Sequence, residues 1–437
     1  MDFIIETLGG PLGRVILGGV VLVAAFFALK AIIVLLKNWW LDEVQLKFAS
    51  DIEKVMLEIR FPRELETFPK AMEQIFSNFY QMYSFGIKPE KKWLEGQIEE
   101  SISAEMISSK DGIRFFIRVN KKLRPLVEAA IFAQYPGTEI IEAEDYVKAF
   151  PTDLPNGEMD IMGADMVLGK DSAYPMRTYP YFFGERKYEE QEVDPIAVLA
   201  EVMSTLKSDE HMWIQILISP AGNKLKEAAD KVIGKISGKK EEPKKKGLLG
   251  GLFDFVHQAA LAPVKYPEWS ASAAKPEDRP KSMSHLENEI IKAVDAKASK
   301  LAFEALVRII YIDSKDSFTS SNFKAATSAF QQFNTQNLNF MRPHKLTITV
   351  PPRFYVPNRK QVLLKKKKEI YTNYIKRDFM IHTNVEAMFK KHLEPSLMNV
   401  EELATIFHPP IRKVSATGLR QVESKKGAPP ANLPIEG

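Results

Sequence analysis

Cysteine is absent from this sequence of 437 residues. Disulfides, thiolate zinc sites, iron–sulfur ligation and cysteine nucleophiles are therefore excluded. A strong charge of one sign is missing as well, because 60 Lys and Arg stand against 56 Asp and Glu, for a formal net charge of +4. This small net charge does not predict a general nucleic-acid coat, so any electrostatic binding must come from local clusters.

Motifs of nucleotide and metal enzymes are also missing. The stretches GADMVLGKD (163–171) and GKISGKK (234–240) have five and three residues between their glycines, where a phosphate-binding loop needs four. The seven histidines form no HExxH pattern, and no G-x-S-x-G occurs. We therefore expect a protein that is not an enzyme, with no catalytic residues, no cofactor and no metal.

One long apolar run, residues 15–36, carries a single charge, Lys30. A helix of this length covers about 33 Å, enough to cross a hydrocarbon core of about 30 Å. The run is too long for a secretory signal, and no small-x-small cleavage site follows it. We predict one membrane span, whose residues include Val15, Leu22, Phe26, Leu29, Ile33 and Leu36.

The residues after this run predict the membrane interface and the orientation. Lys37, Trp39 and Trp40 stand where an interfacial belt is expected. The C-terminal side of the run has more basic residues (Lys30, Lys37 and Lys47) than the N-terminal flank, which has Arg14. This bias favours a cytoplasmic position for the long C-terminal part. No second apolar run of this length follows, so we expect a single-pass protein.

Two α+β units follow from the periodicity of the remaining chain. Residues 50–148 show the order βαββαβ of a ferredoxin-like (split βαβ) unit, with strands at KVMLEIRFP, SISAEMIS and GIRFFIRV. Residues 149–193, rich in proline, glycine and tyrosine, are predicted to be a connector. Residues 194–352 show a βααβαβ order with strands at MWIQILISP, LAFEALVRIIYI and KLTITVP, interrupted by an insertion at 235–284.

The predicted fold class is α+β. A single N-terminal transmembrane helix precedes two ferredoxin-like (split βαβ) units, the second with a long insertion, and a C-terminal helical segment with a Pro-rich tail. The remaining predicted divisions are a membrane anchor and juxtamembrane helix at 1–49, a basic helical segment at 353–409, and a flexible tail at 410–437.

The insertion contains a candidate membrane-surface helix. Three lysines at 244–246 precede apolar residues at helical spacing, a pattern typical of helices that lie on membranes. A helical arm that docks on the parent domain or a neighbouring subunit is the alternative. The candidate lipid-facing residues are Leu248, Leu252, Phe253, Phe255 and Val256.

A local basic cluster with interleaved aromatics occupies residues 353–379. Cations for phosphates and aromatic rings for base stacking are what single-strand binding requires. A solvated helix, an acidic partner subunit and lipid headgroups are the alternatives. The candidate contacts for nucleic acid or an acidic partner are Arg353, Arg359, Lys360, Lys365, Lys366, Lys367, Lys368, Tyr371, Lys376 and Arg377.

Several stretches together resemble a known family. In order they are LEIRFPRELETFPKAMEQIF, RFFIRV, IFAQYPGTEIIEAEDY, DLPN, YPMRTY, DPIAVLAEVMSTL, MWIQILISP and NVEELATIFHPP. They are similar to the membrane-proximal, non-motor region of bacterial coupling-protein-like ATPases of type IV secretion and conjugation. In that family a span and an α+β region precede a HerA/FtsK-like motor, to which a tail resembling ESKKGAPPANLP leads. The resemblance covers essentially the whole chain, and its motifs are weak singly.

The resemblance implies a function in the bacterial cytoplasmic (inner) membrane, with the soluble part in the cytoplasm. No phosphate loop follows the tail, so we expect a non-enzymatic scaffold that positions a separate ATPase or substrate of a DNA-transfer-like machine. The implied partners are the membrane, a separate P-loop ATPase, secretion-system subunits and further copies of the chain. The alternative is a membrane-tethered nucleic-acid-binding protein that acts through residues 353–379, and a lipid-sensing role of 244–261 is a third hypothesis.

Overall fold

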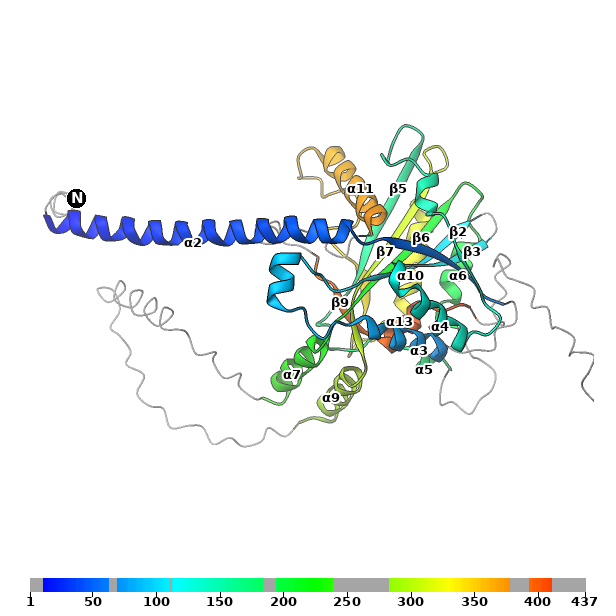
Figure 1. Cartoon of the computed structure of the whole chain (residues 1–437). Helices are drawn as coiled ribbons and strands as arrows, with labels where there is room; N and C mark the ends of the chain where they lie inside the picture. The colour runs from blue at the N-terminus through cyan, green and yellow to red at the C-terminus, as the bar shows by residue number, and fades with distance from the viewer. Residues whose placement is uncertain are drawn as a thin grey trace, which may run out of the picture.

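A single helix of 40 residues, α2 (Pro11–Ser50), leads into the folded body (Figure 1). The computed structural model describes residues 11–62, 69–109, 112–183, 194–238, 283–377 and 393–410. Within these ranges α2 is the one helix long and apolar enough to cross a membrane, by length and composition. Such a helix fits a membrane anchor or a signal sequence. The side chain of the predicted span residue Val15 lies outside the described part, and the others are exposed: Leu22, Phe26, Leu29, Ile33 and Leu36.

A nine-stranded sheet forms the centre of the body, with the strand order β4-β1-β3-β2-β6-β7-β5-β8 and with β9 paired to β7. All of these pairs are antiparallel. The strands are β1 (Lys54–Arg60), β2 (Ile102–Ser109), β3 (Gly112–Asn120), β4 (Glu139–Glu142), β5 (Met159–Leu168), β6 (His211–Pro220), β7 (Ala302–Ser314), β8 (Met341–Pro343) and β9 (Ser396–Asn399).

The α+β class is confirmed, and the elements of the first half follow the predicted order. Helix α3 (Lys70–Phe79) comes after β1, and α4 (Arg124–Gln134) comes between β3 and β4. The two halves share one sheet, because β2 pairs with β6 in the register Glu105↔Gln215. The finer division into two ferredoxin-like units therefore stays a prediction.

Two predicted elements differ from the structure. The predicted connector 149–193 contains β5, a ten-residue strand in the interior of the sheet. The predicted strand KLTITVP is not a strand, although it runs along β5. The reason is that the hydroxyl oxygens of Thr347 and Thr349 accept from the backbone N–H groups of Asp165 (3.1 Å) and Gly163 (2.8 Å), in place of a regular backbone ladder.

Each face of the sheet is covered by different helices. Odd-numbered residues of β7, such as Val307 and Ile309, join the larger core with α3, α4, α6 (Ala197–Ser204), α10 (Ser320–Ala329) and α13 (Val400–Ile406). Even-numbered residues, such as Ile310 and Ile312, pack beneath α11 (Arg359–Lys376). Figure 1 shows α11 on the opposite side of the sheet from α3, α4 and α13.

The remaining helices are short or peripheral. Helices α7 (Lys224–Ile236) and α9 (His285–Ala298) pack together through Val232 and Val294. They flank the predicted insertion, whose candidate membrane-surface residues Leu248, Leu252, Phe253, Phe255 and Val256 lie outside the described part of the chain. The short turns are α5 (Tyr179–Phe183), η1 (Tyr80–Met82), η2 (Lys91–Glu95), η3 (Lys121–Leu123), η4 (Tyr146–Ala149) and η5 (Phe330–Phe333).

Candidate functional site

The inner end of α2 is the place where the apolar helix becomes part of the body. The side chains of Leu41 and Gln45 are buried, whereas Trp39 and Trp40 are exposed. The indole N–H of Trp40 donates to the backbone carbonyl of Trp93 at 3.1 Å. The predicted interface residues therefore lie at the boundary between the exposed and the buried part of α2, and Lys37, one turn earlier, is exposed as well.

A glycine allows α2 and the loop around η2 to touch at the level of their backbones. Gly96 follows η2 and has a φ of +68°, in the left-handed region that favours glycine. A Cβ atom at this position would lie 2.3 Å from the carbonyl oxygen of Val44 in α2. Any larger residue would push the two segments apart. The attachment of α2 is thus close-packed rather than hinged.

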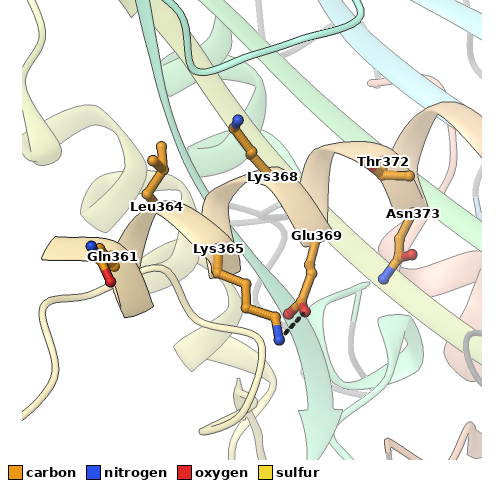
Figure 2. Close-up of a pocket in the computed structure, with 7 residues that line it drawn as sticks. All are labelled: Gln361, Leu364, Lys365, Lys368, Glu369, Thr372 and Asn373. Atoms are coloured by element: carbon orange, nitrogen blue, oxygen red, sulfur yellow. Dashed lines mark ion pairs between the residues drawn. The ribbon is translucent and has the colours of Figure 1, made fainter. Parts of the chain in front are cut away.

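The outer surface of α11 carries the centre of the predicted basic cluster (Figure 2). A shallow open hollow runs along this surface, and Lys365 lies 3.8 Å from Glu369 across one helical turn. Lys368 points to the opposite side of the helix in Figure 2. The hollow is a feature of the solvent-exposed surface, lined by Gln361, Leu364, Lys365, Lys368, Glu369, Thr372 and Asn373.

The ten candidate contacts of this cluster separate into three groups. Lys366 and Lys367 interact with the folded body. Lys366 donates to the backbone carbonyls of Lys345 and Ile348 at 3.4 Å, and Lys367 forms an ion pair with Asp160 at 2.6 Å. Tyr371 and Arg377 are buried, so both are removed from the candidate contacts as a correction. Six side chains remain at the surface, namely Arg353, Arg359, Lys360, Lys365, Lys368 and Lys376.

A row of buried polar residues crosses the sheet beneath α11. Glu105, Gln215, Arg308 and Asp165 lie directly opposite one another on the adjacent strands β2, β6, β7 and β5. Arg308 donates to Asp165 at 2.8 Å and to Gln215 at 3.3 Å, and Gln215 donates to Glu105 at 3.1 Å. Sequence reasoning missed this row. Its signal is a charged or amide side chain between apolar residues in the middle of each of four strands.

Arg377, directly after α11, joins the row to the helix. Its guanidinium donates to both carboxylate oxygens of Glu105 (2.6 and 3.1 Å) and to both of Asp145 (2.8 and 2.9 Å). The hydroxyl of Tyr146 donates to Glu105 at 2.7 Å and lies 2.6 Å from the hydroxyl of Tyr374. Bidentate pairing to two carboxylates fixes the orientation of the arginine as well as its charge.

Burial and charge together set the ionisation of this network. Burial alone would raise the pKa of Glu105, but the charge and hydrogen bonds of Arg377 hold it below its usual range. The pKa of Arg377 is raised well above its ordinary value, against the effect of burial, chiefly by Glu105. Burial and the charge of Arg377 lower the pKa of Arg118, which stands nearby. Glu105 and Arg377 are therefore a charged pair in the folded state.

The chemistry open to this row is ion pairing within the interior. Asp165 Oδ2 and Arg308 Nη2 have no hydrogen-bond partner within the described ranges, and each belongs to a residue that is paired through its other atoms. No group of three or more His, Asp or Glu residues among those described could hold a metal ion. The row fixes the C-terminal end of α11 to the middle of the sheet.

A second buried network holds α13 in the larger core. The stretch NVEELATIF forms α13 behind a capping box, in which Asn399 and Glu402 each bond the other's backbone N–H (2.9 and 3.2 Å). Glu402 also pairs with Lys297 at 2.8 Å, with both side chains buried, and accepts from the backbone N–H of Met176 at 2.9 Å. His408, just after α13, lies 3.0 Å from Asp194.

A comparison with known proteins assigns the chain to a family. Residues 42–417 match the family described as a domain of unknown function (DUF8128). The match covers most of the chain, so the chain belongs to this family. It begins where α2 enters the folded body and includes the sheet, α11 and α13. No curated protein matches the chain.

Proposed function

We propose that this member of the DUF8128 family is a non-enzymatic, membrane-anchored scaffold in a type IV secretion or DNA-transfer-like machine. It positions a separate ATPase or substrate at the bacterial cytoplasmic membrane. The observation that carries the proposal is α2, an unbroken helix whose apolar part is exposed and whose last turns pack against the body through Leu41, Asp42 and Gln45. A rigid strut of this kind sets the height of the body above a bilayer, which a flexible linker does not.

The packing of α2 favours a retained anchor over a cleaved signal. Cleavage after the apolar run would separate the span from Leu41 and Gln45, which are buried in the body, and from the backbone contact at Gly96. Cytoplasmic placement is supported by the lysines that follow the span. The class of machine is inferred from the ordered sequence stretches and their resemblance to the coupling-protein-like family.

The non-enzymatic part of the proposal is supported by the way the buried charges are used. Arg377 and Glu105 satisfy each other, and so do Lys297 and Glu402, all four side chains being buried. Catalytic acids and bases need free access to a substrate and a poised pKa. Groups committed to buried pairs serve instead to fix elements in place.

Co-purification tests the scaffold. The tagged full chain is cross-linked lightly in its own cells and extracted in mild detergent, beside a tagged single-span protein of unrelated sequence expressed at the same level. We expect a P-loop ATPase or secretion-channel subunits with the full chain and not with the control, as mass spectrometry would identify. Recovery of the chain alone, or with nucleic acid only, would count against the scaffold.

A second candidate function rests on the exposed side of the basic cluster. Lys360, Lys365 and Lys368 are exposed on α11, and the loop before it exposes 85% of Phe354 and 64% of Tyr355. This combination fits single-stranded nucleic acid, whose phosphates need cations and whose bases stack on rings. Tyr371 and Tyr374 are buried and do not contribute.

Salt dependence separates this candidate from a solvated helix. If Lys365 and Lys368 contact phosphates, the double variant Lys365→Glu/Lys368→Glu should flatten the plot of log affinity against log salt by about one to two units of slope. The measurement is titration of labelled single-stranded DNA with the full chain in detergent micelles. The control is Lys226→Glu/Lys231→Glu, two exposed lysines of α7. Equal losses in both variants would refute a specific contact.

A further inference from the structure

The loop from Ser84 to Gly96 presents large apolar side chains to solvent. Phe85 is 91% exposed, Leu94 is 74% exposed and Trp93 is 37% exposed. Three large apolar side chains exposed on one short loop are a common feature of interaction surfaces. The loop, with η2 in its second half, is named here the η2 loop.

The backbone of the η2 loop holds Phe85 outward at an energetic cost. Phe85 has a φ of +55°, in the left-handed region that a bulky residue seldom adopts. The strain amounts to roughly 1–2 kcal/mol for a residue with a side chain. Strain of this kind is found where function requires a set geometry. The exposed position of Phe85 is thus built into the loop.

The η2 loop lies at the height of the predicted membrane interface. The hydrogen bond from Trp40 to the carbonyl of Trp93 places the two residues at the same level along α2. Trp40 follows the last residue of the apolar run, Leu36, by about 6 Å of helix. Figure 1 shows the light-blue turn of η2 directly beside the inner end of α2, on the side from which α2 arrives.

The polar residues of the loop suit lipid headgroups. Lys88, Lys91 and Lys92 are exposed around the apolar side chains, with Glu90 and Glu95 as the opposing charges. Lysine stems cover apolar surface while their ammonium groups reach phosphates, and aromatic rings settle at the headgroup level. A protein partner at this height would have to fit between the body and the bilayer. The headgroups of the bilayer lie at this height whenever α2 spans the membrane.

We propose that the η2 loop rests in the headgroup layer of an anionic bilayer and forms a second membrane contact beside α2. Phe85, Trp93 and Leu94 enter the interface, and the three lysines bind lipid phosphates. The inference rests on the proposed function, since it requires α2 to be an anchor. A single span leaves the body free to tilt and rotate. A second contact fixes one side of the body against the membrane.

The absence of cysteine makes a direct test possible. The variant Leu94→Cys carries the only thiol of the chain, and its exposed position tolerates a dye. The labelled full chain is reconstituted into phosphatidylcholine vesicles with about 30 mol% phosphatidylglycerol, and quenching by spin-labelled lipids is measured. Leu29→Cys, in the apolar part of α2, reports whether the anchor is inserted. Val198→Cys, exposed on α6 away from α2 in Figure 1, is the control outside the bilayer.

We expect strong quenching at Leu29 and Leu94 and none at Val198. Quenching at Leu29 without quenching at Leu94 would overturn the second contact and leave the anchor standing. If Leu29 is not quenched, the anchor of the proposed function fails, and this inference with it. The change Lys88→Glu/Lys91→Glu/Lys92→Glu should at least halve quenching at Leu94 in the anionic vesicles. Unchanged quenching at position 94 in this variant would show that the three lysines do not bind lipid phosphates.

Discussion

Replacing Arg377 with methionine is expected to lower the free energy of unfolding by about 3–5 kcal/mol, the usual loss when one partner of a buried ion pair is removed. The variant leaves Glu105 fully buried without its bidentate partner. It also frees Asp145 and detaches the end of α11 from the sheet. Arg118, half-buried nearby, keeps part of the compensating charge, so the lower end of this range is expected.

The same variant should change how stability depends on pH. In the parent chain the pKa of Glu105 lies below its ordinary value of 4.5, so its pairing stabilises the fold above that pH and is lost as pH falls through the lowered pKa. Without Arg377, burial is expected to raise the pKa of Glu105. As pH falls, Glu105 then takes up a proton, and the variant no longer carries an unpaired buried charge. The stability difference between the two proteins should therefore shrink toward acid pH.

Urea unfolding of the full chain in detergent micelles, followed by near-ultraviolet circular dichroism, measures both effects. The matched control is Arg359→Met, an exposed arginine at the other end of α11, for which a change below about 0.5 kcal/mol is expected. Arg377→Lys keeps a charge but loses the bidentate geometry, so an intermediate loss is expected. Equal stability of Arg377→Met and Arg359→Met would show that the buried row does not hold α11.

Replacing Glu402 with glutamine is expected to cost about 3–5 kcal/mol as well, because Lys297 is then a buried charge without a partner. The backbone N–H groups of Met176 and Asn399 donate to different oxygens of Glu402, and glutamine keeps only one acceptor oxygen. The variant therefore loses the charge together with one of these two hydrogen bonds. Burial already lowers the pKa of Lys297, and loss of Glu402 should lower it further. The variant should regain stability at alkaline pH, where Lys297 loses its proton.

A double variant and an exposed pair provide the controls for this prediction. Lys297→Met/Glu402→Gln removes the unpaired charge and should recover most of the stability lost in Glu402→Gln. Glu53→Gln breaks the exposed pair with Lys121 and should change stability by less than about 1 kcal/mol. If the double variant is as unstable as the single one, the loss comes from the cap of α13 rather than from the charge.

Strands with a clear alternation of apolar and polar residues could be predicted from sequence. In a strand every second side chain lies on the same face, so the alternation tells which side chains are buried together. Val55, Leu57 and Ile59 of β1 lie together in the larger core, as the alternation predicts. The segment around Thr347 and Thr349 has the same alternation but lies beside β5 without forming a strand. Its threonine hydroxyl oxygens accept hydrogen bonds from the β5 backbone instead. The alternation of residues does not distinguish this side-chain bonding from a regular strand pairing.

The basic cluster shows the same limit for the candidate site. In the run of four lysines on α11, Lys365 and Lys368 are exposed, whereas Lys366 and Lys367 contact the body. Tyr371 and Arg377 belong to the same stretch of sequence yet are buried, because the inner side of α11 packs on the sheet. Arg377 pairs with Glu105 and Asp145, and Tyr371 donates to the carbonyl of Pro151. All three partners lie more than two hundred residues earlier in the chain, a separation that no local pattern expresses.

The position of α13 in the core has a consequence for the order of events during synthesis. The ring of Phe407, just after α13, lies 6.2 Å from that of Phe76 in α3 and 5.8 Å from that of Phe115 in β3. Most of the chain separates these partners, and such distant pairings form slowly. As the ribosome extends the chain, α2 emerges first and α13 emerges among the last described elements. If α2 enters the membrane as it emerges, the nascent body is tethered there with its core open until residues near 407 arrive to close it.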